Sequence, residues 1–292
     1  MYYLQNIHLK NFCGYKNCSL LFSQNKKHNP ISVFYGPNGE GKSSVLQAIR
    51  LVSNPYQFFG RENDMFFRKL TFQENYDPTA EGYVAPENNL LIKAEYVDID
   101  GKTRSSTLDS KGMVESCLKR YNSDQEGWSL YCDVDHPINM NKFQLYTKNK
   151  DLFINLAKDI YEFDVELDKK VESEWVDKTT REVIQFYQNF ILNKKDAKIH
   201  FRRMSDGEKK IATLLRFLCD EIVFNPSKII LIDNIEMHIY FKRHAMLVDK
   251  LTKLFPDRQF IVTTHSQTLI EHVSNKFGDH CLYDLETINK NS

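Results

Sequence analysis

The segment Gly36-Pro-Asn-Gly-Glu-Gly-Lys-Ser43 combines glycines, a lysine and a serine at a spacing suited to phosphate chemistry. It matches the pattern G-x-x-x-x-G-K-[ST] in full. The glycines allow backbone N–H groups to turn inward around a phosphate, Lys42 can reach the β- and γ-phosphates, and the Ser43 hydroxyl can ligate Mg²⁺. The pattern therefore predicts a nucleoside triphosphate and Mg²⁺ site formed by Asn38, Gly39, Gly41, Lys42, Ser43 and Ser44.

The residues around this loop predict the elements that hold it. Ile31–Tyr35 is a compact apolar run, and residues 42–52 carry apolar side chains at helical spacing. A strand, a glycine loop and a helix in this order begin an α/β nucleotide-binding unit. Further strands are predicted at 2–12, 20–22, 228–233 and 259–266, and a hairpin at 90–108. Residues 151–192 are predicted to be helical, with apolar spacing of three and four at 151–163 and 179–192, and further helices are predicted at 208–223, 240–254 and 267–275.

A second acidic position follows a buried strand near the other end of the chain. Residues 229–232 are all apolar, and they leave Asp233 at the carboxyl edge of the strand, where α/β sheets bind ligands. We expect Asp233 to hold Mg²⁺ together with Ser43. Upstream, the loop Met204-Ser-Asp-Gly-Glu208 precedes a predicted helix, and Ser205 suits the N-cap of that helix.

These segments together resemble a known family. The opening IHLKNFCGYKNCSLLF with ISVFYGPNGEGKSSVLQAI is similar to the amino-terminal half of SMC, RecF and OLD-type ATPases, and MSDGE resembles the ABC signature in the form these proteins carry. The resemblance covers about residues 1–60 and 200–275. It implies an α/β fold, a P-loop NTPase ABC-type head with a mixed sheet, formed by 1–60 and 200–292, with a β-arm and helical lobe inserted at 61–199. It also implies ATP rather than GTP.

The resemblance further implies a dimer. In these relatives the signature loop of one subunit closes on the γ-phosphate bound by the other, so Ser205 and Gly207 are expected to reach a partner's phosphate. The chain is then a homodimer or a higher homo-oligomer.

A glutamine that reports on nucleotide is expected in the middle lobe, with Gln144 preferred and Gln57 as the alternative. His265, at the end of QFIVTTHS, is implied to contact the γ-phosphate and to position the attacking water.

One position departs from the family pattern. ABC-type ATPases usually carry glutamate directly after the aspartate that corresponds to Asp233, and this chain has Asn234 there. Asparagine can hydrogen-bond water but cannot accept its proton. Glu236 lies two residues further on, as in OLD-type relatives, and is the candidate base. General-base help is worth about 10²–10⁴-fold, so we expect slow ATP hydrolysis with Asn234, Glu236 and His265 as catalytic residues. The alternative is a nucleotide-gated scaffold that binds ATP and dimerises with little or no hydrolysis.

Composition sets further limits. Lys+Arg and Asp+Glu are both 39 among 292 residues, which argues against coating nucleic acid through bulk charge. The small basic clusters at 202–203 and 242–244 could still bind DNA phosphates if they lie on one surface of the dimer. The six cysteines form no metal-binding pair, and neither a signal peptide nor an apolar run of membrane-spanning length is visible. These features predict a soluble, cytoplasmic protein with no membrane association and reduced thiols. A membrane-transporter ATPase is a weaker alternative, because the opening hairpin and the combination of GPNGEGKS with SDGE resemble SMC-like heads more.

The expected function follows from the motifs and the resemblance together. We predict an ATPase whose nucleotide-driven head dimerisation controls DNA processing or a partner effector, in DNA repair or antiphage defence. The sequence shows no nuclease motif, so a nuclease effector is expected to be a separate chain, and direct DNA binding is possible.

Overall fold

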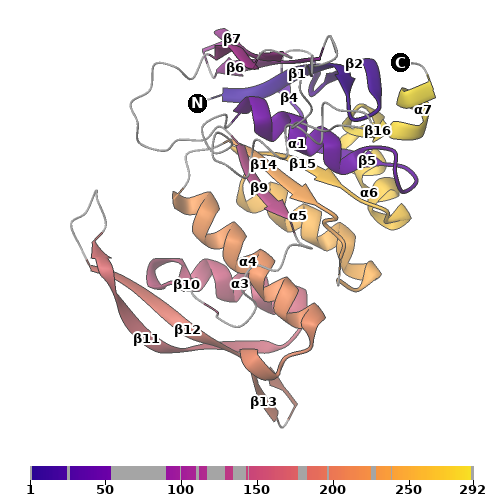
Figure 1. Ribbon diagram of the computed structural model, residues 1–292. Helices are drawn as coiled ribbons and strands as arrows, with labels where there is room; N and C mark the ends of the chain where they lie inside the picture. The colour runs from indigo at the N-terminus through magenta and orange to yellow at the C-terminus, as the bar shows by residue number, and fades with distance from the viewer. Residues whose placement is uncertain are drawn as a thin grey trace, which may run out of the picture.

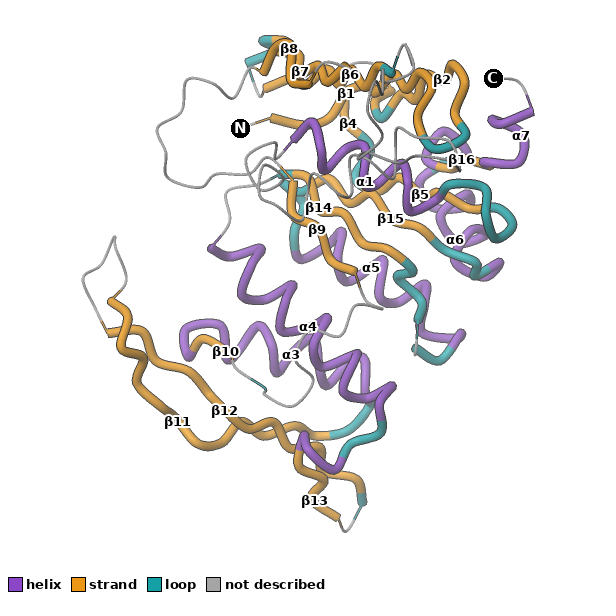
Figure 2. Tube along the Cα trace, viewed as in Figure 1, coloured by secondary structure: helices purple, strands orange, loops and turns teal. Residues whose placement is uncertain are grey.

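The computed structural model describes residues 2–24, 27–53, 90–98, 100–109, 112–116, 129–133, 143, 145–176, 183–195, 197–224, 228–237 and 239–290. It has an upper lobe, which holds both chain ends and the phosphate-loop segment, and a lower lobe that ends in a long β-hairpin (Figures 1 and 2).

A five-stranded parallel sheet forms the centre of the upper lobe, in the order β16-β5-β15-β14-β9. Its strands are β5 (Ile31–Tyr35), β9 (Ser129–Asp133), β14 (Ile229–Asp233), β15 (Gln259–Thr263) and β16 (Leu282–Asp284). β5, β14 and β15 are almost wholly apolar because both of their faces are covered. The carboxyl ends of these strands share one edge, which brings Gly36, Asn234 and Thr264 to the same side of the lobe.

A five-stranded antiparallel sheet lies above the parallel one, in the order β2-β1-β6-β7-β8. Its strands are β1 (Tyr2–Phe12), β2 (Tyr15–Leu21), β6 (Leu91–Asp98), β7 (Thr103–Asp109) and β8 (Gly112–Ser116), and β3 (Ser23–Gln24) and β4 (Lys27–His28) form a separate ribbon. Helix α1 (Lys42–Ser53) lies between the two sheets (Figure 1). Its apolar residues, among them Val45 and Ile49, share one core with both sheets.

Helices cover the opposite face of the parallel sheet. They are α4 (Asp206–Phe224), α5 (His244–Leu254) and α6 (Gln267–Phe277). Alternate residues of β14 separate the two cores, since Ile229 and Leu231 join the α1 side, whereas Ile230 and Ile232 join the side of these helices. Short segments complete the lobe: η4 (Phe241–Arg243), η5 (Asp279–Cys281) and α7 (Leu285–Lys290). Among the described helices none is long and apolar enough to cross a membrane.

The lower lobe joins helices to a twisted sheet. It contains η2 (Thr147–Asn149), α3 (Lys150–Tyr161), η3 (Phe201–Arg203) and the strands β10 (Leu145–Tyr146), β11 (Asp164–Val176), β12 (Val183–Lys194) and β13 (Ala197–His200). The sheet order is β10-β12-β11, with β13 also paired to β12. Aromatic side chains from each part of the lobe, including Phe143, Phe153 and Phe190, contact one another and tie the sheet to α3.

The structure corrects the predicted helical stretch 151–192 beyond α3, because its described residues after Phe163 form the strands β11 and β12. The apolar residues of the segment 179–192 happen to recur at spacings of three and four. Residues 185–189 are nevertheless all half-buried, so both faces of strand β12 are partly covered. For this reason polar and apolar residues do not alternate along the strand. The enrichment in Val, Ile, Phe and Tyr was the signal that favoured a strand. The strand predicted at 20–22 is the end of the longer strand β2, and the other predicted strands and helices are confirmed within a few residues of their predicted bounds.

The division into 1–60 with 200–292 and an inserted 61–199 stays a prediction. Strands from within 61–199 pair with the flanking segments: β6 with β1, and β9 with β14. The middle of the chain therefore contributes strands to both sheets of the upper lobe.

Candidate nucleotide site

The phosphate loop has the backbone conformation that its glycines allow. Gly36, Gly39 and Gly41 all have positive φ angles, of 140°, 90° and 85°. Tyr15 supports the loop from β2, and its hydroxyl donates to the carbonyls of Glu40 and Gly41 at 3.3 and 3.1 Å. A Cβ on Gly41 would lie 3.0 Å from the Tyr15 ring, so glycine is needed here for space as well as for conformation. The loop is thus a cradle of backbone N–H groups at the start of α1.

Lys42 is the buried cation of this loop. Its side chain is 7% exposed, and Nζ donates to the carbonyls of Gly36 and Pro37 at 2.9 and 2.8 Å. Burial lowers the pKa of Lys42, while the negative charges of Asp233, Glu236 and Glu40 oppose that shift. The ammonium therefore lies in a field of carboxylates from the loop itself and from the end of β14.

Asp233 ends β14 and is almost fully buried. The Thr263 hydroxyl, at the end of the neighbouring strand β15, donates to Asp233 Oδ1 and accepts from the backbone N–H of Asn234 at 2.8 Å. Asn234 has a φ of 49°, in the left-handed region that asparagine tolerates better than most residues. The backbone turn after Asp233 thus gives a structural reason for asparagine at the position where the family pattern has glutamate.

Glu236 is held by the neighbouring strand end. Its Oε2 accepts from the Thr264 hydroxyl at 2.7 Å and its Oε1 accepts from the backbone N–H of His265 at 2.6 Å. An ionised carboxylate has about four lone-pair sites, so each oxygen can still accept another proton donor. The His265 ring is exposed. Ser266 then caps α6 by accepting from Leu269 N–H. The loop after β14 and the loop after β15 are therefore joined through Glu236.

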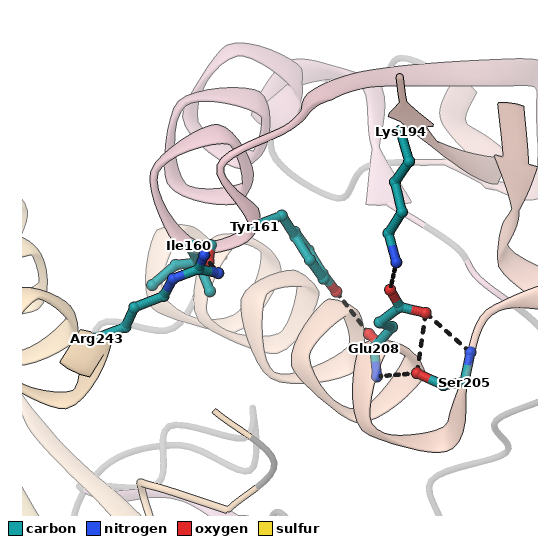
Figure 3. Close-up of polar contacts among 6 residues, drawn as sticks. All are labelled: Ile160, Tyr161, Lys194, Ser205, Glu208 and Arg243. Carbon is teal, nitrogen blue, oxygen red and sulfur yellow. Dashed lines mark hydrogen bonds and ion pairs between the residues drawn. The ribbon is translucent and has the colours of Figure 1, made fainter. Parts of the chain in front are cut away.

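The loop that contains Ser205 forms a capping box at the start of α4 (Figure 3). Glu208 Oε2 accepts from the backbone N–H and the hydroxyl of Ser205 at 3.0 and 2.9 Å, and Glu208 N–H points back to Ser205 Oγ at 3.3 Å. The expected N-cap role of Ser205 is confirmed. Ser205 is exposed and Gly207 is half-buried.

This loop and the phosphate loop of the same chain lie in different lobes. The amino-terminal end of α4 lies beside β13 in the lower lobe, whereas the phosphate loop lies at the end of β5 in the upper lobe (Figure 1). Arg243 connects η4 to the lower lobe by donating to the Ile160 carbonyl (Figure 3), and it also pairs with Glu162.

Most predicted site residues gather at one edge of the parallel sheet. Lys42, Asp233, Glu236 and the backbone of His265 come together there, with Asn38 exposed on the loop and Ser43 and Ser44 half-buried at the start of α1. Gln144 and Gln57 lie outside the described residues. The sequence interpretation missed Thr263, Thr264 and Tyr15; the Thr-Thr pair directly after an apolar strand was an available signal for the first two.

Comparison with known proteins agrees with this arrangement. The sequence matches the family described as RecF/RecN/SMC N terminal domain over residues 3–281. It is 24% identical to the Septu protein PtuA of Bacillus mycoides (strain KBAB4), over 90% of this chain and 38% of that protein. It is also 33% identical to the retron Vc95 probable ATPase of Vibrio cholerae serotype O1 biovar El Tor, over 28% of this chain and 18% of that protein. The chain thus spans less than two-fifths of the length of these relatives.

Solved structures share the fold at low sequence identity. The SMC head domain from Thermotoga maritima superposes with a TM-score of 0.57 at 18% identity, over 92% of this chain and 91% of that one. The recombination mediator protein RecF superposes with a TM-score of 0.51 at 15% identity, over 92% of this chain and 94% of that one. The family match, the phosphate loop and the shared fold lead to one assignment: the chain belongs to the RecF/RecN/SMC family and is an SMC- and RecF-like ABC-type P-loop ATPase head.

Proposed function

We propose that this chain hydrolyses ATP slowly and uses nucleotide-driven dimerisation to control a separate effector. The observation that carries the proposal is the position of Glu236. Two donors from the end of β15 orient its carboxylate, and its charge acts on the buried Lys42 of the phosphate loop. A carboxylate fixed beside a phosphate cradle is suited to act as a general base.

The residues present fit ATP and Mg²⁺. The loop between Gly36 and Lys42 has positive-φ glycines, and Gly39 has no neighbouring atom within 4 Å of an added Cβ position, so phosphate oxygens can approach the backbone. Ser43 and Asp233 supply the hard oxygen ligands that Mg²⁺ prefers. When bound, Mg²⁺ would neutralise charge on the phosphates. Lys42 would add a second positive charge from the protein itself.

Glu236 and Asn234 divide the work that one glutamate does in most relatives. Asn234 can orient a water molecule through its amide, and Glu236 can accept a proton at either carboxylate oxygen. His265 would contact the γ-phosphate and position the water, since its backbone lies against Glu236 and its ring is exposed. This division supports turnover that is slower than in ATPases with glutamate at position 234.

The separation of the two loops supports a dimer. Ser205 and Gly207 belong to the start of α4, which lies in the lower lobe, whereas the phosphate loop of the same chain follows β5 in the upper lobe (Figure 1). A second copy would therefore have to supply them to each nucleotide. Hydroxyl and N–H donors at a helix start are suited to phosphate oxygens. We therefore propose a homodimer, or a higher homo-oligomer, with nucleotide between the subunits.

The proposed setting is DNA repair or antiphage defence with a separate effector, such as a nuclease. It rests on the similarity to a Septu protein and to retron ATPases, each of which this chain matches over only part of its length. We further propose that the chain contacts DNA directly and that it is located in the cytoplasm.

The test compares ATP turnover and oligomeric state in three proteins: wild type, Glu236→Gln and Asn234→Glu. We expect slow turnover in wild type, loss of turnover in Glu236→Gln with ATP binding retained, and an ATP- and Mg²⁺-dependent increase in mass by light scattering. The second candidate function is a nucleotide-gated scaffold, which Asn234 favours. It predicts ATP-dependent dimerisation with no turnover in any of the three proteins.

A further inference from the structure

The carboxylate of Glu208 lies between the signature loop and the β11–β12 hairpin. One oxygen, Oε2, accepts both bonds from Ser205, and the other oxygen, Oε1, accepts from Lys194 Nζ (Figure 3). Both side chains are partly shielded, with Lys194 at 32% and Glu208 at 19% exposure. A hydrogen bond between ionised partners is shorter and stronger than one between neutral groups. Lys194 therefore limits where Glu208, and with it Ser205, can lie.

Lys194 lies at the base of the β11–β12 hairpin, where the two strands are paired. It is the last residue of β12, and the preceding residue, Asn193, pairs with Asp164 at the start of β11. The next residue, Lys195, has a φ of 50° and begins the turn into β13. The Lys194 ammonium also lies 5.6 Å from the centre of the Phe163 ring. Any movement at the base of the hairpin would therefore be passed to the Lys194 side chain.

The opposite side of Glu208 is fixed by α3. The Tyr161 hydroxyl donates to the Glu208 backbone carbonyl at 2.6 Å, and Tyr161 itself is buried in the core that also holds Phe190 of β12. The backbone of Glu208 is thus held by one element and its carboxylate by another. Within the described part of the hairpin, Lys194 is the residue that forms a hydrogen bond and ion pair with Glu208.

We propose that Lys194 is a positioning residue for the Ser205 hydroxyl, and that through Glu208 it couples the β11–β12 hairpin to the signature loop. The proposal rests on the function proposed for Ser205 above. Without Lys194, Glu208 can turn toward solvent, and Ser205 loses the acceptor that fixes its N–H and its hydroxyl. Binding or displacement at the hairpin would change how well one subunit completes the nucleotide site of the other.

The experiment compares Lys194→Met, Lys194→Arg and the matched control Lys198→Met. Lys198 forms a more exposed ion pair, with Glu166, in the same small sheet, and within the described part of the chain neither residue has a hydrogen bond or ion pair to Glu208. Methionine keeps the aliphatic length of lysine against Phe163. The readouts are ATP binding to the isolated chain, ATP- and Mg²⁺-dependent dimerisation by light scattering, kcat and KM for ATP, and amide hydrogen exchange in the peptide that contains Ser205.

We expect Lys194→Met to weaken ATP-dependent dimerisation by about tenfold or more, the size expected for a lost charge-assisted hydrogen bond. ATP binding to the isolated chain should stay unchanged, and exchange of the Ser205 amide should speed up. Lys194→Arg should restore both ATP-dependent dimerisation and the slower exchange of the Ser205 amide. Lys198→Met should behave as wild type. Equal exchange at Ser205 in Lys194→Met and Lys198→Met would overturn the proposal.

The exchange readout separates this proposal from the proposed function. If wild type neither dimerises nor turns over ATP, the function is wrong, yet faster exchange at Ser205 in Lys194→Met still supports the positioning role. If wild type dimerises and turns over ATP but Lys194→Met leaves dimerisation and exchange unchanged, the function stands and the positioning role is wrong.

Discussion

The backbone N–H of His265 donates to Glu236 Oε1 at 2.6 Å, so the loop after β15 directly orients the candidate base that follows β14. The Thr264 hydroxyl holds the other carboxylate oxygen at 2.7 Å. Two adjacent residues of one loop therefore fix both oxygens of Glu236. Any change of this loop is expected to change the position of the carboxylate.

Thr264→Val keeps the shape of the side chain but removes the bond to Glu236, together with the acceptor of the Ser266 backbone N–H at 3.0 Å. A hydrogen bond to a charged group contributes about 1.5–3 kcal/mol, so we expect kcat for ATP hydrolysis to fall about tenfold or more. Binding of ATP should change little, because Thr264 is not part of the phosphate loop. Single-turnover and steady-state phosphate release would measure the effect. Thr264→Ser, which keeps the hydroxyl, serves as the control, and a loss of equal size in this variant would contradict the explanation.

Asn234 gives a prediction about stability that is independent of catalysis. Because its φ is 49°, glycine should fit this position better than alanine. We expect Asn234→Ala to unfold with a free energy about 1 kcal/mol lower than Asn234→Gly, although alanine is normally the more stabilising of the two. Both variants lose the amide, so the comparison isolates the backbone. Urea unfolding of both proteins checks it, and an equal or higher stability of Asn234→Ala would contradict the prediction.

The phosphate loop offers a matched pair of glycines. Gly41→Ala would place a Cβ 3.0 Å from the Tyr15 ring at a φ of 85°, whereas Gly39→Ala meets no atom within 4 Å at a φ of 90°. Both substitutions should lower the free energy of unfolding by about 1 kcal/mol through backbone strain. Gly41→Ala should lower it further because Tyr15 must move. Thermal unfolding and ATP titration would measure the difference. Equal losses in the two variants would show that contact with Tyr15 is not decisive.

The sequence predicted the parts of the site that depend on local patterns. The phosphate loop, the buried strand before Asp233 and the helix after Ser205 each lie within one short segment, so residue types and spacing were sufficient. The hydrogen bond from Thr264 to Glu236 and the contact of Lys194 with Glu208 join residues far apart in the chain. The contact of Thr264 with Glu236 depends on the order of the strands in the parallel sheet. The contact of Lys194 with Glu208 depends on the path of β12, a segment whose sequence resembled a helix.

The last prediction concerns pH and the pair of Lys194 and Glu208. Burial raises the pKa of Glu208, but hydrogen bonds from Lys194 and Ser205 outweigh it and hold the pKa below the ordinary value for glutamate. The Tyr161 hydroxyl, from α3, donates to the Glu208 backbone carbonyl. A carboxylate with a lowered pKa in the folded protein stabilises the fold above its ordinary pKa of about 4.3, and this contribution is lost as the pH falls through the lowered value.

Lys194→Met removes the partner that lowers this pKa. We therefore expect wild type to be more stable than Lys194→Met near neutral pH, and the difference to shrink as the pH falls below about 4, where Glu208 becomes protonated in both proteins. Urea unfolding at a series of pH values measures the difference directly. Glu208→Gln provides the control, because it cannot titrate, so adding Lys194→Met to it should give a difference that does not depend on pH. A wild-type advantage that stays constant down to the acid limit would mean that the ion pair does not stabilise the signature loop.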